Sequence, residues 1–267
     1  MPPVKITSTK NPYVKKLLEL REKKSRDKTG LMIVEGTREL FAAKNAQVNF
    51  KELYVCHDFL KEEAQRFVKS FKKEVKVFET SEHVFKKISF GERLEGVVAV
   101  CEKPKRSLQD LKISAKSLLL IVERVEKPGN LGAILRTADA AGIDGVILAD
   151  SVTDASNPNV VRSSLGTLFS VPVVESSNEK TLNFLKENKI MVAAADPGAK
   201  DVYTHLHLNM PLAIVLGSEQ KGLSSFWQRN SDFKMKIPMR GQADSLNVST
   251  TAAILIYEAL RQRNLEK

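Results

Sequence analysis

The pattern of apolar and polar residues divides the chain into two regions of different regularity. Beyond residue 116, six apolar runs alternate with segments of helical periodicity. The runs are predicted to form strands at 117–123, 145–150, 169–175, 190–196, 212–219 and 233–239. Helices are expected near 130–141, 157–165, 178–188, 222–229 and 245–263. Because most of the runs are almost continuously apolar, they indicate an α/β domain whose parallel sheet is covered by helices on both faces.

Residues 1–106 follow a looser pattern, which predicts a small α/β domain. Strands are expected at 31–36, 50–56, 74–79 and 95–101, and helices at 11–22 and 37–46. The composition changes at a polar stretch that contains Lys103, Pro104 and Arg106. We therefore predict a first domain over residues 1–106, a linker over 107–116 and a second domain over 117–267.

The net charge of +10 is concentrated in the first domain. Residues 1–106 carry 24 Lys and Arg against 15 Asp and Glu, whereas the rest of the chain carries 18 against 17. Such an imbalance fits either a solvated basic surface or a phosphate-rich partner. The most basic stretch, residues 23–28, is expected to be a loop and is a candidate for contact with RNA phosphates.

Composition narrows the class of protein in other ways. No apolar run is long enough to cross a bilayer, and the first residues lack the apolar core of a signal peptide. Cys56 and Cys101 lie in separate apolar runs, which predicts buried, reduced thiols in a cytoplasmic protein. No grouping of Cys, His and carboxylate residues favours a metal site.

Three stretches at strand-to-helix junctions carry the polar and glycine residues of a candidate ligand site. They are VEKPGNLGAILRTADAAG at 125–142, LGSEQKGLS at 216–224, and IPMRGQADSLNVSTT from Ile237 onward. Ligands of open α/β sheets bind at such junctions. Each stretch also has an ordinary explanation when taken alone. Asn130 and Ser245 can cap helices, and Arg136 can pair with Asp139 one helical turn later.

The first stretch is a poor match to a dinucleotide-binding fingerprint. Asp150 follows at about the expected distance, but Gly129 and Gly132 are spaced G-x-x-G instead of G-x-G-x-x-G. This spacing argues against a nucleotide-dependent oxidoreductase.

Together, and in this order, the three stretches resemble almost residue for residue the motifs of the SpoU (TrmH-like) branch of the SPOUT RNA methyltransferases. The resemblance covers residues 117–267. The first domain is similar to the ribosomal-protein-like substrate-binding domain of members that modify rRNA. Thr250 and Thr251 depart from the family pattern, in which aliphatic residues are frequent at these positions, and this affects only helix packing.

The resemblance implies a deep trefoil knot, S-adenosylmethionine held in a bent form by the loops of the knot, and a homodimer whose active sites are completed across the interface. It also implies methylation of a ribose 2′-hydroxyl in RNA, and the basic first domain favours ribosomal over transfer RNA. The alternative is a non-catalytic RNA-binding or ribosome-assembly protein on the same fold.

The resemblance also implies roles for individual residues. The catalytic set is Asn130, Arg136, Glu219, Ser245 and Asn247. Because a guanidinium stays protonated, we expect Arg136 to grip a phosphate and to stabilise charge on the ribose oxygen.

The predicted cofactor-binding set is Leu216, Gly217, Ile237, Met239, Ser245, Leu246 and Asn247. Glycine at 217 and 241 is expected to let the backbone approach the cofactor. The predicted RNA-binding set is Lys23, Lys24, Arg26, Lys28 and Arg162. No metal is expected.

Overall fold

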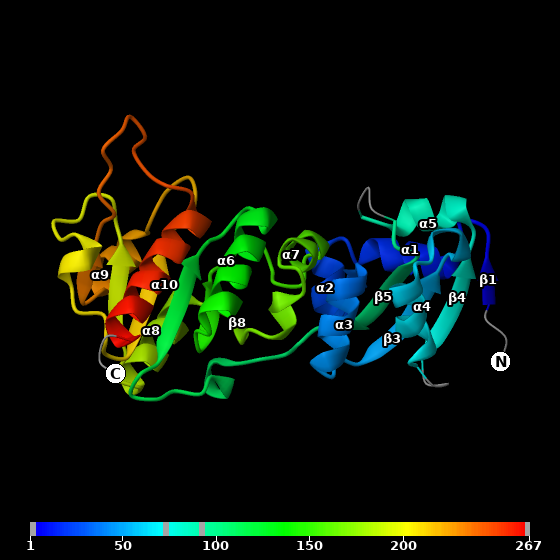
Figure 1. Ribbon diagram of the computed structural model, residues 1–267, viewed down its shortest axis with the longest axis horizontal. Helices are drawn as coiled ribbons and strands as arrows, with labels where there is room; N and C mark the ends of the chain where they lie inside the picture. The colour runs from blue at the N-terminus through cyan, green and yellow to red at the C-terminus, as the bar shows by residue number, and fades with distance from the viewer. Residues whose placement is uncertain (1–3, 72–74, 91–93, 265–267) are drawn as a thin grey trace. The chain divides into compact units, whose positions relative to one another are not determined.

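The computed structural model describes residues 4–71, 75–90 and 94–264, and the chain forms two compact units (Figure 1). The first unit comprises the residues up to Pro104 together with Ser156–Ser170. The second comprises Lys105–Ala155 and the residues from Val171 onward. Within the described ranges, no helix is both long and apolar enough to cross a membrane.

The second unit is built on a six-stranded parallel sheet, as predicted, with the strand order β11-β9-β10-β6-β7-β8. Its strands are β6 (Leu118–Glu123), β7 (Gly145–Ala149), β8 (Val173–Ser176), β9 (Met191–Ala195), β10 (Leu212–Leu216) and β11 (Phe233–Met235). β7 follows β6 on one side, whereas β10 pairs with β6 on the other. The order of the strands therefore reverses between β6 and β10.

Helices cover both faces of this sheet. They are α6 (Pro128–Ala141), α8 (Asn178–Glu187), α9 (Ser225–Asn230) and α10 (Val248–Asn264). On one face, Leu185 of α8 and Trp227 of α9 pack in a core with Ile121 and Val215. α6 and α10 pack against each other on the other face, where Figure 1 shows them side by side. Burial of both faces explains why the strands read as continuous apolar runs.

The first unit has a mixed five-stranded sheet with the order β1-β4-β3-β5-β2. Its strands are β1 (Val4–Ile6), β2 (Leu31–Glu35), β3 (Phe50–Val55), β4 (Lys76–Thr80) and β5 (Val97–Glu102), and its first five helices are α1 (Pro12–Glu19), α2 (Lys23–Thr29), α3 (Thr37–Asn45), α4 (Glu62–Lys69) and α5 (Glu82–Ile88). The predicted small α/β domain is therefore present. β1 lies where no strand is predicted, and residue 74 of the predicted strand 74–79 lies outside the described residues.

Residues 156–170 belong to the first unit, although they come from the middle of the predicted second domain. They form α7 (Pro158–Ser163), which packs against β2, and the short 3₁₀ helix η3 (Thr167–Phe169). Gly166 has a φ of 84°, and a Cβ added to it would lie 2.7 Å from the Ala42 side chain. A division of the sequence into two continuous domains cannot predict that a segment from the middle of the second belongs to the first unit.

Two other expectations differ from the structure for identifiable reasons. The strand predicted at 169–175 begins only at Val173, because Phe169 ends η3 and Pro172 has no N–H to donate to a sheet. The predicted linker is packed instead of loose. Ser107 and Asp110 form a capping box, and Leu111 is buried in the core of the second unit.

Candidate active site

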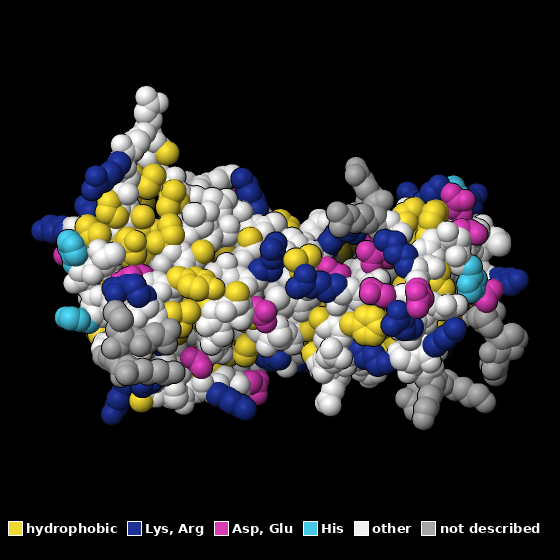
Figure 2. Space-filling model, viewed as in Figure 1, with side chains coloured by type: hydrophobic (Ala, Val, Ile, Leu, Met, Phe, Trp, Pro, Cys, Tyr) yellow, Lys and Arg dark blue, Asp and Glu magenta, His cyan; other side chains and the backbone are white. Residues whose placement is uncertain are grey.

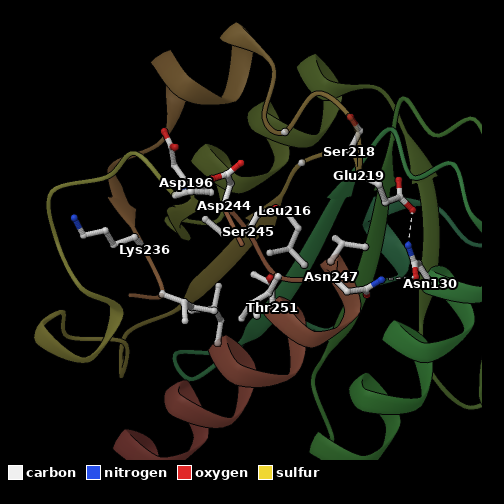
Figure 3. Close-up of a pocket in the computed structure, with 18 of the residues that line it drawn as sticks. Asn130, Asp196, Leu216, Ser218, Glu219, Lys236, Asp244, Ser245, Asn247 and Thr251 are labelled. Carbon is white, nitrogen blue, oxygen red and sulfur yellow. Dashed lines mark hydrogen bonds between the residues drawn. The ribbon is translucent and has the colours of Figure 1, made fainter. Parts of the chain in front are cut away.

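A cavity of about 580 Å³ lies at the carboxyl ends of β9, β10 and β11 (Figure 3). The segments that follow these strands form most of its wall, and the first turns of α6 and α10 complete it. It lies close to the point where the strand order reverses, which is where open α/β sheets bind ligands. Its volume is in the range of cofactor sites.

The three stretches identified in the sequence converge on this cavity. All residues of the predicted cofactor-binding set line it: Leu216, Gly217, Ile237, Met239, Ser245, Leu246 and Asn247. Asn130 and Glu219 of the predicted catalytic set line it as well. Arg136 is absent from this lining.

A chain of hydrogen bonds connects the three stretches at one side of the cavity (Figure 3). The amide nitrogen of Asn130 donates to Oε1 of Glu219 at 2.9 Å, and the amide oxygen of Asn130 accepts from Asn247 at 3.1 Å. Asn247 in turn accepts from the backbone N–H and the hydroxyl of Ser249, at 2.9 and 2.7 Å. Both ends of the Asn130 amide are thereby fixed in orientation.

Glu219 also holds the beginning of α6. Its carboxylate accepts the backbone N–H groups of Glu126 and Lys127, each at 3.2 Å. Desolvation on its own would raise the pKa of Glu219, but the hydrogen bonds from Asn130 and from these backbone groups outweigh it and lower the pKa below its ordinary value. An ionised carboxylate at a helix N-terminus is also favoured by the helix dipole.

Replacing Glu219 by glutamine is expected to lower the free energy of unfolding at neutral pH by about 1–3 kcal/mol. The amide would turn an N–H group toward one of the three donors. Because the folded-state pKa is lowered, the contribution of Glu219 is present above its unfolded-state pKa and is lost as the pH falls through the folded-state value. Urea unfolding of both proteins in increasingly acidic buffers should therefore show the difference shrinking. Glu179→Gln, exposed in the first turn of α8, is the control.

Gly217 is required by the fold of its own loop. A Cβ there would lie 2.1 Å from the carbonyl carbon of Gly222 and 2.2 Å from the nitrogen of Leu223. The loop closes through two backbone hydrogen bonds of 3.0 Å between Ser218 and Gly222. Gly241 has no atom within 4 Å of an added Cβ. The fold of the chain itself therefore requires glycine at 217 and does not require it at 241, where close approach to the cofactor stays a prediction.

The last helix begins later than predicted, and a different residue caps it. α10 starts at Val248, not at Ser245. The side chain of Asn247 accepts the backbone N–H of Ser249, which is the hydrogen bond of an N-cap. Ser245 is exposed in the segment before the helix and lines the cavity. Capping thus explains Asn247 in part and does not explain Ser245.

Arg136 lies on an exposed part of α6, six residues beyond Asn130. Six residues place it about 9 Å further along the helix axis and on a different face. The ion pair with Asp139 that the sequence allows is not formed, and no other partner of the guanidinium is found among the described residues. The side chain is therefore available to a ligand.

Sequence reasoning missed four charged residues that line the cavity, namely Lys127, Asp196, Lys236 and Asp244. Asp196 directly follows β9, as Gly217 follows β10, so the same junction rule could have identified it. Its carboxylate accepts the backbone N–H of Gly198 at 2.8 Å.

The basic stretch at 23–28 forms helix α2, so the expected loop is wrong. Arg26 is only 1% exposed, and its guanidinium donates to the carbonyl oxygens of Leu20 and Arg21 at 2.8 and 2.6 Å. It therefore caps the end of α1 and does not face solvent. Lys23, Lys24 and Lys28 are exposed. On the visible face of the first unit, Lys and Arg are interspersed with Asp and Glu (Figure 2).

Arg162, also expected to contact RNA, faces a carboxylate within the first unit. Its Nη1 lies 3.9 Å from Oε1 of Glu35, whose carboxylate is almost fully buried. Desolvation raises the pKa of Glu35, while the backbone N–H of Phe90 and the charge of Arg162 act against this rise. The position of Arg162 is thus explained by charge compensation at a buried carboxylate.

Comparisons with known proteins agree with this architecture. Residues 117–257 match the SpoU rRNA Methylase family, and residues 11–99 match the MRM3-like substrate binding domain. The chain is 32% identical over 254 residues to the 23S rRNA (guanosine(2553)-2′-O)-methyltransferase RlmP of Bacillus subtilis, covering 94% of this chain and 97% of that protein.

Solved structures are similar over nearly the whole chain. The SpoU methyltransferase AviRb from Streptomyces viridochromogenes, in complex with AdoMet, is 27% identical with a TM-score of 0.89, over 95% of this chain and 98% of that one. The crystal structure of an RNA 2′-O ribose methyltransferase is 39% identical with a TM-score of 0.85, over 98% and 100%. The fold, the cavity and these similarities together define the protein as a methyltransferase built on a parallel sheet. The chain belongs to the SpoU rRNA methylase family.

Proposed function

We propose that this protein methylates a ribose 2′-hydroxyl of ribosomal RNA at the cavity beside Asn130 and Glu219. The reaction class and the cofactor, S-adenosylmethionine, are those of its family, with AdoMet-bound relatives of the same fold. The observation that carries the proposal is the convergence of all three sequence motifs on one cavity. When bound, S-adenosylmethionine supplies a methyl group on a positively charged sulfur.

The lining of the cavity suits such a cofactor. Leu216, Ile237 and Leu255 provide apolar surface for an adenine ring, and the carboxyl groups of Asp196 and Asp244 can balance its positive groups. The backbone of the loop after Leu216 lies at the wall, where its N–H and C=O groups can fix orientation.

Methylation of a hydroxyl requires the oxygen to be aligned with the methyl group and its developing negative charge to be stabilised. We assign charge stabilisation and phosphate binding to Arg136, because a guanidinium is a poor base but a strong bidentate partner of phosphate. Asn130, held by Glu219 and Asn247, is assigned the orientation of the ribose. Ser245 and Asn247 are assigned to the cofactor side of the site.

We further propose that the protein acts as a homodimer and that a second copy completes each active site. This would explain why Arg136 is exposed and lies outside the residues that line the cavity of its own chain. The trefoil knot and the division into a substrate-binding and a catalytic domain remain predictions of the same kind. Because the proposed substrate is ribosomal RNA, we place the reaction in the cytoplasm.

Transfer of radiolabelled methyl from S-adenosylmethionine to unmodified ribosomal RNA tests the proposed function. Label is expected in the large-subunit RNA, the substrate named for the Bacillus subtilis relative. Binding of S-adenosylhomocysteine without any transfer of label, to rRNA or to tRNA, would instead support a non-catalytic RNA-binding protein. If the protein did not bind S-adenosylhomocysteine, both the assignment of the cavity as the cofactor site and the proposed activity would be rejected.

The exposed lysines of α2 are expected to contribute to RNA affinity. Replacing Lys23, Lys24 and Lys28 together by alanine should weaken binding and reduce the slope of log K against log salt by about one for each lost phosphate contact. Filter binding over a series of salt concentrations measures this slope. Alanine at Lys180, Lys186 and Lys200, three exposed lysines of the second unit, should leave the slope unchanged.

A further inference from the structure

A second, smaller cavity of about 300 Å³ adjoins the cofactor cavity. Its lining includes Arg124, Glu126, Val152 and Lys221, from the segments after β6, β7 and β10. Ser218 and Gly222 line both cavities, so the loop that contains Glu219 separates them. A group bound in the second cavity would therefore lie one loop away from the methyl donor.

Glu126 is rigidly held in the wall of this second cavity. Its backbone N–H donates to Glu219, and its carbonyl oxygen accepts from the hydroxyl of Thr153. Its carboxylate, by contrast, has no hydrogen bond or ion pair among the described residues. The position of Glu126 is therefore fixed through its backbone, while both carboxylate oxygens are available to accept hydrogen bonds from a ligand.

The other carboxylate of this cavity has no such freedom. Glu123 is 1% exposed, and its two oxygens accept from the amide of Asn178 at 2.9 Å and from the backbone N–H of Ser224 at 2.8 Å. Glu123 therefore holds the cavity together, and Glu126 is the acidic group left to contact a ligand.

Basic and strained residues surround the same cavity. Arg124 and Lys221 are exposed, and Lys127 lies next to Glu126 at the edge of the cofactor cavity. Arg124 has a φ of 52°, a left-handed conformation that is strained for a residue with a side chain and that is often found at functional sites. Positive groups around a carboxylate suit a ligand that carries phosphates and also donates hydrogen bonds.

We propose that the second cavity takes the base of the nucleotide whose ribose is methylated, and that Glu126 selects guanine. This inference rests on the proposed function. An ionised carboxylate can only accept hydrogen bonds. Guanine presents two adjacent donors, N1–H and the 2-amino group, on its Watson–Crick edge. Adenine, cytosine and uracil each place an acceptor beside their donor there. Bases splayed from single-stranded RNA are read on this edge.

The identity of the methylated nucleoside tests the proposal directly. Unmodified large-subunit RNA is treated with the protein and S-adenosylmethionine, digested to nucleosides and examined by mass spectrometry. The expected product is 2′-O-methylguanosine. A 2′-O-methyl derivative of adenosine, cytidine or uridine would overturn the selection of guanine and leave the proposed function intact. Absence of any 2′-O-methylated nucleoside would overturn both.

Glu126→Gln tests the residue. It should lower kcat/KM about 5- to 150-fold, as for a lost bidentate base contact, with the Kd of S-adenosylhomocysteine and the Tm unchanged. Glu187→Gln, exposed at the end of α8, is the matched control. RNA with inosine at the methylated position lacks the 2-amino group and should be a poorer substrate for the unaltered protein. Equal kcat/KM with inosine and guanosine, or an unaffected Glu126→Gln variant, would remove Glu126 from this role.

Discussion

Replacing Arg136 by alanine is expected to lower the rate of methyl transfer by about a hundredfold to a thousandfold, the usual cost of removing one donor that stabilises a developing oxyanion. Cofactor affinity should not change, because Arg136 does not line the cavity proposed to bind the cofactor. Folding should also be preserved, because the side chain is exposed on α6 and has no partner among the described residues. Single-turnover methyl transfer and calorimetric binding of S-adenosylhomocysteine measure the two quantities separately.

Two comparisons make the result specific to the guanidinium. Arg229→Ala removes an exposed arginine from α9 and should have no effect on the rate. Arg136→Lys retains the charge but loses the bidentate geometry, so its rate should lie between those of the unaltered protein and Arg136→Ala. For the unaltered protein, a rate that does not vary with pH around neutrality is expected, since a guanidinium group cannot act as a titrating base in that range. If the rate of the unaltered protein changed sharply with pH near neutrality, and Arg136→Ala lost this pH dependence, the assigned role would be contradicted.

Replacing Gly217 by alanine is expected to reduce the free energy of unfolding by about 2–4 kcal/mol and to weaken cofactor binding at least about tenfold. The new Cβ would lie 2.1 Å from the carbonyl carbon of Gly222 and 2.4 Å from its oxygen, and these backbone atoms have no freedom to rotate away as a side chain would. The loop from Gly217 to Gly222 must therefore open, and it carries both Ser218 and Glu219 to new positions at the cavity.

Gly241→Ala is the matched control for this substitution. It lies in the segment before α10, where an added Cβ meets no atom within 4 Å. Its free energy of unfolding should change by less than about 1 kcal/mol, because alanine meets no steric clash there and makes the unfolded chain less flexible. Thermal and urea unfolding, with titration of S-adenosylhomocysteine, compare the pair. If both variants were equally damaged, the steric explanation of Gly217 would be wrong.

Two patterns are sufficient to predict much of the second unit: the periodicity of apolar residues, and the rule that ligands bind at strand-to-helix junctions of an open α/β sheet. Apolar runs indicated all six strands, because strands buried on both faces have no polar alternation to obscure them. The convergence of residues around 130, 217 and 245 followed from the rule that parallel strands end at one edge of a sheet. Single sequence motifs could not supply the hydrogen bonds between Glu219, Asn130 and Asn247, which depend on tertiary packing.

Predictions failed where a side chain has two chemically reasonable environments. The composition of residues 23–28 resembles a solvated loop, yet Arg26 turns inward because two carbonyl oxygens at the end of α1 need donors. Ser245 looks like a helix cap, but Asn247 makes the capping hydrogen bond. Glu126 is not predicted by any sequence pattern, since nothing local distinguishes an unpaired carboxylate in a cavity from one on an ordinary surface.

The incorporation of residues 156–170 into the first unit has a consequence for recombination between relatives. The chain passes from one unit to the other three times, after Pro104, after Ala155 and after Ser170. A chimera that exchanges the N-terminal part alone would pair a foreign β2 with the native α7, and would separate Arg162 from the Glu35 that it accompanies. An exchange of the complete first unit therefore requires three junctions, and residues 156–170 must be inherited together with the N-terminal sequence.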